Sequence, residues 1–474
     1  MNDKQKKQNN HMYWRQKRID FKEEVLNPIS PSYCAAKWSQ VTIHLGSGHT
    51  HSCHHPKTHL IPLEEIKRSP SALHNTSFKI EQRLDMLNGK RPTECEYCWQ
   101  VEDQGEVLSD RVLKSYEPWS KDRISDLQGL NHVNPSYLEI SFSNVCNFKC
   151  SYCSPDVSSK WMEEIEKFGA YPTSQKFNNI EWIKIQDKMP FLERDLNPYV
   201  EAFWQWWPEL YPTLHTFRIT GGEPLMTKHT FKVLDYIIEH PNPELELVIN
   251  SNLCVPEKII DEFIEKIQKI QTANAVKNVM VYTSCEAYGA QAEYIRFGMD
   301  YKQWLLNCDR YLSSVPNSQI HIMSTYNLLS VTSYQQFLED ILVLKRKHCS
   351  PRVNNNHAVY IDIPYLNYPS HQVVGLLSED FITKIQIQID FMQDNIDKNE
   401  TDRMGFFISE IGKLQRVLTV FESKIKNGYP EKEKFRKDFV KFVDEHDRRR
   451  GTNFGNTFPE LVEFYNACKE MPAK

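Results

Sequence analysis

Three cysteines in one short loop carry the clearest chemistry of this sequence. The stretch NVCNFKCSYCS places Cys146, Cys150 and Cys153 at Cys-x3-Cys-x2-Cys spacing. Closely spaced thiolates are soft ligands that suit zinc or an iron–sulfur cluster. A closed tetrahedral site needs four ligands, and three leave one position open for chemistry. We therefore predict a metal centre with an open position in this loop.

A second motif, TGGEP, follows further along the chain. Gly221 and Gly222 permit close approach of the backbone, so their peptide groups could grip a small polar ligand. Glu223 offers an anionic acceptor suited to an ammonium group, and Pro224 stiffens the turn. Taken alone, these four residues also fit a plain strand-to-helix turn.

Four more cysteines lie near the start of the chain. Cys34 and Cys53 flank the alternating stretch WSQVTIHL and the turn-like GSGHTHS, which predict a β-hairpin, and CEYC adds Cys95 and Cys98. Four thiolates make a complete metal site, for which structural zinc is one candidate. One histidine of the hairpin could replace a cysteine as ligand, or the histidines could simply be exposed: His49, His51, His54, His55 and His59.

Composition excludes several classes of protein. The 474 residues include 57 Lys and Arg against 62 Asp and Glu, so no basic field recruits long nucleic acid. No run of about 18 apolar residues predicts a membrane span, and the polar start MNDKQKKQNN has no secretion-signal core. We expect no membrane association and a reducing cytoplasm, where clustered cysteines read as metal ligands.

The elements that must position these motifs form an α/β pattern. Six strands are predicted, at 137–143, 213–220, 245–251, 276–284, 318–327 and 357–366, with helical segments such as 230–240 and 258–270 between them. Strands alternating with helices indicate a parallel sheet, and six suggest a partial (β/α)6 barrel rather than a closed eight-stranded one. Active sites in such folds lie at the carboxyl ends of the strands, where the cysteine triplet and GGEP both fall.

Changes in sequence texture suggest five regions. We predict a polar, irregular tail (1–33), a small Cys-rich β-hairpin domain (34–105), a connector (106–135), the barrel (136–377) and a helical C-terminal region (378–474). The last region has apolar residues at helical spacing in 407–425 and 433–450. Its DRRR stretch (447–450) is interpreted as a solvated helix end.

Together the two central motifs resemble the radical S-adenosylmethionine (radical SAM) enzymes. The resemblance rests on Cys146-x3-Cys150-x-Tyr152-Cys153 after a first strand and on the GGEP turn after a second. It implies a [4Fe–4S] cluster on the three cysteines, with S-adenosylmethionine chelating the fourth iron. In that family an electron from the cluster cleaves the cofactor to a 5′-deoxyadenosyl radical, which takes hydrogen from the substrate. The missing fourth ligand would then be the cofactor itself.

The resemblance also assigns roles to residues around the cofactor. Tyr152 would pack near the adenine, and Glu223 would accept from the methionine ammonium. Asn250 and Asn252, in NSN at the end of the third strand, are candidates for ribose contacts.

A stretch after the fourth strand, TSCEAYG, resembles the family's Ser-x-Asp-Gly segment. Ser284 and the later Arg296 would bind the methionine carboxylate. Glu286 stands where Asp is more usual, so a part in proton transfer is a hypothesis for this carboxylate.

The front cysteines resemble the auxiliary-cluster domains of radical SAM enzymes, called SPASM and, in shortened form, twitch. The shared pattern is Cys34, a spacer, Gly48-x4-Cys53 and a Cys-x2-Cys pair. Here the pattern precedes the barrel instead of following it, and the seven-cysteine SPASM set is incomplete. The resemblance therefore implies at most one auxiliary [4Fe–4S] cluster, acting as an electron relay, with zinc as the alternative.

The resemblance implies a substrate class and a redox partner. Enzymes with such auxiliary domains often modify a peptide or protein, and they take electrons from a flavodoxin- or ferredoxin-type donor. A small-molecule or nucleotide substrate is the alternative. A non-catalytic scaffold with zinc in both sites is the hypothesis from another class.

Overall fold

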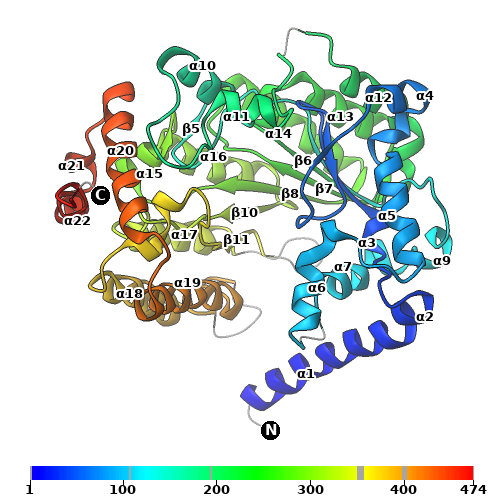
Figure 1. Ribbon diagram of the computed structural model, residues 1–474, viewed down its shortest axis with the longest axis horizontal. Coiled ribbons are helices and arrows are strands. Elements are labelled where there is room, and N and C mark those ends of the chain that lie inside the picture. The colour runs from blue at the N-terminus through cyan, green and yellow to red at the C-terminus, as the bar shows by residue number, and fades with distance from the viewer. Residues whose placement is uncertain (1–2, 106–107, 193–194, 350–356, 398–402, 473–474) are drawn as a thin grey trace. The chain divides into compact units, whose positions relative to one another are not determined.

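The computed structural model describes residues 3–105, 108–192, 195–349, 357–397 and 403–472. Its contacts divide the chain into two compact units, each described by itself. The first unit comprises Met1–Ser143, Phe191–Ile219 and Glu244–Leu247. The second comprises Asn144–Pro190, Thr220–Pro243 and Val248–Lys474. Helices and strands alternate along the chain, which gives a mixed α/β structure (Figure 1).

The strands of the first unit follow the order β6-β4-β1-β2-β3. They are β1 (Gln40–His44), β2 (His49–His51), β3 (His59–Leu60), β4 (Tyr137–Ser141) and β6 (Thr216–Thr220). The predicted hairpin is confirmed, because β1 pairs antiparallel with β2 in the register Thr42↔His51. β1 also pairs in parallel with β4, with Val41 opposite Leu138. The hairpin is therefore continuous with the sheet that leads to the cysteine triplet.

Helices of the first unit surround a core rich in aromatic residues. They are α1 (Asp3–Phe21), α2 (Asn27–Ile29), α3 (Ala36–Ser39), α4 (Leu63–Arg68), α5 (Ser77–Leu87), α6 (Glu96–Asp103), α7 (Asp110–Tyr116), α8 (Pro118–Lys121), α9 (Ile124–Leu127) and α12 (Pro198–Leu210). One apolar cluster joins Phe21, Tyr33, Trp38 and Trp99, and Cys34 and Cys95 pack against it.

The prediction of an irregular tail over 1–33 is wrong, because α1 occupies most of it. Helix α1 itself contains no Gly or Pro and consists largely of good helix formers. Its last residue, Phe21, is buried in the aromatic cluster and secures the helix to the unit. Polarity was therefore a poor guide to disorder here.

The second unit contains the parallel strands β8 (Val276–Ser284), β10 (Gln319–Met323) and β11 (Val359–Asp362). β10 pairs in parallel with both neighbours, with His321 opposite Tyr282 and Tyr360. β7 (Asn242–Asn250) is the next strand beside β8, with residues 244–247 in the first unit and its ends in the second. A separate antiparallel pair joins β5 (Lys149–Cys150) to β9 (Arg296–Phe297). All six strands predicted from the sequence are present, whereas closure into a barrel is not shown.

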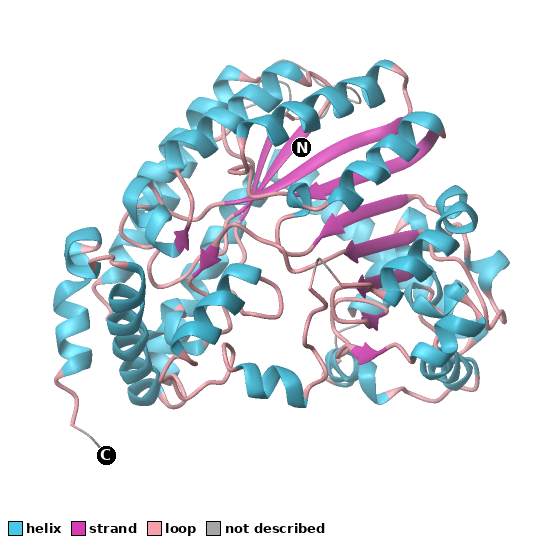
Figure 2. Ribbon diagram, turned by 90° about the horizontal axis from the view of Figure 1, so that it is seen from above, coloured by secondary structure: helices cyan, strands magenta, loops and turns pink. Residues whose placement is uncertain are grey.

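Helices flank these strands, as Figure 2 shows in cyan against magenta. They are α10 (Ser159–Phe168), α11 (Ile180–Ile185), α13 (Lys228–Glu239), α14 (Glu257–Thr272), α15 (Gly289–Ile295), α16 (Tyr301–Ser314), α17 (Tyr334–Lys347), α18 (Phe381–Asp394), α19 (Ile408–Asn427), α20 (Lys432–Arg450), α21 (Phe454–Thr457) and α22 (Val462–Lys469). α14 has a strongly amphipathic pattern and buries Ile260, Phe263 and Ile267. Within the described ranges, no helix is long and apolar enough to cross a membrane.

Candidate functional site

The predicted cofactor residues converge on one cavity of about 360 Å³ in the second unit. The strand ends and the cysteine loop all contribute to its wall, as expected for the carboxyl edge of a parallel sheet. Nearly all the residues predicted for the cluster and cofactor line it: Cys146, Cys150, Tyr152, Cys153, Gly221, Gly222, Glu223, Pro224, Asn250, Asn252, Ser284 and Arg296. Ser251, Tyr282 and Thr325 also line it, although the sequence did not single them out.

The three cysteines of the loop line the same cavity, Cys146 buried and Cys150 and Cys153 partly buried. Burial, together with the neighbouring Cys150, raises the pKa of the Cys146 thiol to about 12. Burial raises the pKa of Cys153 as well, with added effects of Cys150 and Cys146. Thiols in this setting keep their protons unless a cation replaces them, so the donor set fits a bound metal cluster.

The GGEP turn docks directly on the backbone of the cysteine loop. The amide of Glu223 donates to the carbonyl of Val145 at 2.7 Å. A Cβ placed on Gly222 would lie 2.3 Å from that same carbonyl oxygen and 2.7 Å from the carbonyl oxygen of Asn144. Gly221 has a φ of 120°, which L-residues with side chains rarely adopt. The two glycines are therefore required for the turn and the loop to meet.

Glu223 is fixed by three hydrogen bonds. Its carboxylate accepts from the Ser251 hydroxyl at 2.7 Å, from the Asn252 amide at 2.6 Å and from the Leu225 amide at 3.0 Å. Burial raises the pKa of Glu223 to about 7, against the lowering effect of these donors. The result is a pre-oriented carboxylate at the cavity wall, and a cationic ligand group would favour its ionised form.

Asn252 is committed to structure as well as to the cavity. Its Nδ2 donates to Oδ1 of Asn147 in the cysteine loop at 2.7 Å, and its Oδ1 accepts from the Cys254 amide at 2.9 Å. Asn147 in turn donates to the Cys254 carbonyl at 2.9 Å. The turn after β7 and the cysteine loop are thus joined by side-chain amides.

Arg296 lies on the cavity wall but its charge is already matched. It forms an ion pair with Glu286 at 2.6 Å, and both side chains are buried. Its Nη2 also donates to the Tyr152 hydroxyl at 2.5 Å. Glu286 is not among the residues that line the cavity. Its predicted part in proton transfer stays a hypothesis without a contact to the cavity.

The interpretation of DRRR as a solvated helix end holds for the exposed Arg448 but is wrong for Arg449 and Arg450. The side chains of Arg449 and Arg450, in the last turn of α20, are almost completely buried. Arg450 pairs with Glu164 at 3.0 Å and donates to the carbonyl of Lys149, the neighbour of Cys150, at 2.7 Å. Lys149 and Tyr171 also bond to Glu164, each at 2.7 Å. Helix α20 therefore contacts the cysteine loop and stabilises it through Arg450.

The four front cysteines meet in the first unit. Cys34, Cys53, Cys95 and Cys98 line one small cavity of about 20 Å³. Burial, with a smaller effect of the nearby Cys34, raises the pKa of Cys53 and of Cys95 to about 11. The described residues contain no disulfide. The structure thus brings together a thiol just before α3, one just after β2, one in the turn before α6 and one in α6 itself.

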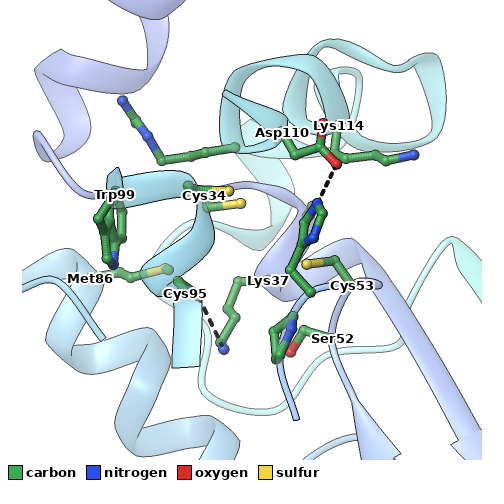
Figure 3. Close-up of a pocket in the computed structure, with 14 residues that line it drawn as sticks. Cys34, Lys37, Ser52, Cys53, Met86, Cys95, Trp99, Asp110 and Lys114 are labelled. Carbon is green, nitrogen blue, oxygen red and sulfur yellow. Dashed lines mark hydrogen bonds and ion pairs between the residues drawn. The ribbon is translucent and has the colours of Figure 1, made fainter. Parts of the chain in front are cut away.

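A lysine lies among these thiols, as Figure 3 shows. Lys37 is buried, its Nζ donates to Sγ of Cys95 at 3.9 Å, and it forms an ion pair with Glu94. The remaining cavity is water-sized. The thiols suit a metal, but a [4Fe–4S] cluster fits here only if the Lys37 side chain moves aside.

Lys37 and Arg111 lie on the wall of this cavity, and Lys79 and Arg83 lie elsewhere in the same unit. Arg111 is matched by Glu102 at 2.8 Å. Lys79 and Arg83 are fully buried with neutral partners, among them the Thr50 hydroxyl at 2.8 Å and the Asn75 side chain at 2.8 Å. Burial lowers the pKa of Lys79 well below its usual value and that of Arg83 to about 9, because their charged forms lose hydration.

His55 is the hairpin histidine that lies on this cavity. Its Nε2 bonds to Asp110 at 2.7 Å, and its ring stacks on Tyr97 at 3.7 Å. Asp110 and Lys114 come from α7, inside the segment predicted as a connector. Spacing along the chain gave no sign of these long-range neighbours.

Over the described part of the chain, no three Cys, His, Asp or Glu side chains are close enough to hold a single metal ion. A zinc ion draws thiolates to about 2.3 Å from one centre. An iron–sulfur cluster holds its thiolates on different iron atoms and spaces them more widely. The looser grouping of the triplet is compatible with a cluster.

Comparison with known proteins adds one finding. No protein-family model matches the chain. A curated protein with similarity is the GTP 3',8-cyclase of Helicobacter pylori (strain ATCC 700392 / 26695), a radical SAM enzyme, at 26% identity over 116 residues. The similarity supports the radical SAM superfamily. It implies, in general terms, a [4Fe–4S] cluster and S-adenosylmethionine. The matched region covers 24% of this chain and 27% of the cyclase, so the chain spans about a quarter of that relative's length.

The close contact at Gly222 predicts the effect of one methyl group. Gly222→Ala should destabilise the protein by about 1–3 kcal/mol, because the new Cβ overlaps the Val145 carbonyl. Denaturant unfolding would measure this. Gly412→Ala is a matched control in helix α19, where a Cβ meets nothing within 4 Å, and it should be neutral or stabilising. Equal effects of both substitutions would contradict the close-contact interpretation.

The Glu164 pair predicts a loss of stability in acid. Although burial opposes it, Arg450 lowers the pKa of Glu164 from 4.5 to about 2, aided by bonds from Arg450, Lys149 and Tyr171. A depressed carboxyl pKa contributes stability that is present above pH 4.5 and lost as pH falls towards 2.

Thermal unfolding across this pH range should show the loss in the wild type. Glu164→Gln should be less stable near neutral pH and should lose less on acidification. The exposed neighbour variant Glu163→Gln should keep the wild-type profile. An acid profile of Glu164→Gln identical to that of the wild type would show that Glu164 does not cause the loss of stability at low pH.

Proposed function

We propose that this protein is a radical SAM enzyme. The observation that carries the proposal is the convergence of the three thiols of the loop with Glu223, Asn250 and Ser284 on one cavity. In this proposal the sheet and its helices form a partial (β/α)6 barrel of the radical SAM type. Cys146, Cys150 and Cys153 hold a [4Fe–4S] cluster. The cluster and S-adenosylmethionine together supply reductive cleavage of the cofactor and hydrogen abstraction from the substrate.

The side chains of the cavity bind and orient the cofactor. The thiols lose their protons on ligating iron, which removes the cost of burying them as anions. Glu223 receives the methionine ammonium, since Ser251 and the Asn252 and Leu225 amides already hold its carboxylate in place. Tyr152 and Asn250 provide the aromatic and polar wall for the nucleoside.

A peptide or protein is the proposed substrate class, and a flavodoxin- or ferredoxin-type protein in the cytoplasm is the proposed electron donor. A small-molecule or nucleotide substrate is the second candidate. The similarity to an enzyme named for its action on GTP favours this second candidate.

In the first unit, we propose that Cys34, Cys53, Cys95 and Cys98 form an auxiliary metal centre of the twitch type. The buried Lys37 and Arg111 on the wall of this cavity support an anionic centre there. Zinc is the alternative occupant: the cavity beside Lys37 is small, but the described thiols would have to move closer together to hold a single ion.

The proposal predicts that substitutions in the two groups of cysteines have different effects on cofactor cleavage. Cys150→Ala should abolish reductive cleavage of S-adenosylmethionine, because the catalytic cluster loses a ligand. Cys95→Ala is the matched control: it should lose the metal of the front centre and keep some cleavage. Metal analysis and assay of 5′-deoxyadenosine under anaerobic conditions measure both. Cleavage that survives in Cys150→Ala would refute the assignment of the triplet.

The geometry of Glu223 predicts how S-adenosylmethionine is held. Glu223→Gln keeps the shape of the side chain and removes its charge. We expect weaker binding by about 1.5–3 kcal/mol, the value of a charge-assisted hydrogen bond. Equilibrium binding to the reconstituted protein measures the change, with the exposed Glu239→Gln on α13 as control. Unchanged affinity in Glu223→Gln would exclude the ammonium contact.

A further inference from the structure

One sulfur of the triplet has a charged neighbour that the proposed function does not use. β5 pairs with β9 so that Cys150 lies opposite Arg296. Nη1 of Arg296 donates to Sγ of Cys150 at 3.6 Å. Cys146 receives a bond from a neutral backbone amide instead, that of Phe148, at 3.4 Å. Cys150 is therefore the ligand of the three to which the structure gives a hydrogen bond from a charged side chain.

The guanidinium that makes this bond is fixed from the other side. Its Nε and Nη2 both donate to Oε2 of Glu286, at 2.9 and 2.6 Å. The Arg296 side chain is 7% exposed and that of Glu286 is 1% exposed. In such a dry setting, both charges act strongly on a neighbouring anionic group. Glu286 and Tyr152 together fix the orientation of the Arg296 guanidinium, which places its Nη1 against the Cys150 sulfur.

We propose that the Arg296–Glu286 pair tunes the reduction potential of the cluster held at Cys150. The inference rests on the proposed function, since it concerns the same cluster. Hydrogen bonds to ligand sulfurs and local net charge are two determinants of iron–sulfur potentials. Arg296 stabilises the added electron and raises the potential, while Glu286 offsets part of that charge. The step is a one-electron reduction by the external donor, in which no bond is made or broken.

The proposal differs from the predicted role of Arg296 as a ligand for the methionine carboxylate. A carboxylate ligand acts only when S-adenosylmethionine is bound. A tuning pair acts on the cluster without it. Measurements in the absence of S-adenosylmethionine therefore distinguish the two roles.

The test is a redox titration of the reconstituted protein, followed by electron paramagnetic resonance without S-adenosylmethionine. A Cys95→Ala background removes the front centre, so one cluster gives the signal. Arg296→Gln should shift the potential to more negative values, and Glu286→Gln should shift it to more positive values. Arg296→Lys keeps the charge and should lie between the wild type and Arg296→Gln. A structural defect alone would not give shifts of opposite sign.

Each outcome has one meaning. Potentials unchanged in all variants, or shifted in the same direction by Arg296→Gln and Glu286→Gln, would overturn the inference. An unchanged potential with weaker S-adenosylmethionine binding in Arg296→Gln would overturn the inference and support the role of Arg296 as a ligand for the methionine carboxylate. If Arg296→Gln does not fold, Arg296→Lys and Glu286→Gln still test the sign. Absence of a cluster in the Cys95→Ala parent would instead count against the proposed function.

Discussion

Burial of several thiols side by side is the constraint on which both units depend. Each thiol that loses its proton in a dry interior needs a compensating cation. The second unit provides Arg296 beside Cys150 and Arg450 behind the same loop. The first unit provides Lys37 among the front thiols. These cations are held in place by their own carboxylate partners, Glu286, Glu164 and Glu94. Both groups of cysteines therefore lie beside fixed positive charge.

Backbone contacts then define the shape of the site in the second unit. The GGEP turn meets the cysteine loop through the Glu223 amide, and Gly222 has no side chain to keep them apart. The turn after β7 joins the same loop through Asn252 and Asn147. Three segments from distant parts of the sequence therefore form one wall. Loss of any one contact would affect both the three cysteines of the loop and the Glu223 carboxylate.

The sequence was informative where function depends on local spacing. The cysteine triplet, GGEP and the strands that precede them were predictable, because ligand spacing and alternating burial are local patterns. Partners brought in from far along the chain were not predictable. The sequence pattern predicts a solvated charge at Arg450. In the structure its side chain is buried and donates to Glu164 and to the Lys149 carbonyl. Lys37 sits three residues after Cys34 in an apolar stretch, and only the fold shows that it enters the cavity.

The central claim is that the triplet holds a cluster with one iron open to S-adenosylmethionine. The most direct measurement is Mössbauer spectroscopy of the ⁵⁷Fe-reconstituted protein, with and without S-adenosylmethionine, in the Cys95→Ala background. The account predicts a [4Fe–4S] spectrum in which one iron changes its parameters when the cofactor is added. A protein that takes up zinc but no iron, or a cluster whose four irons all ignore the cofactor, would contradict it.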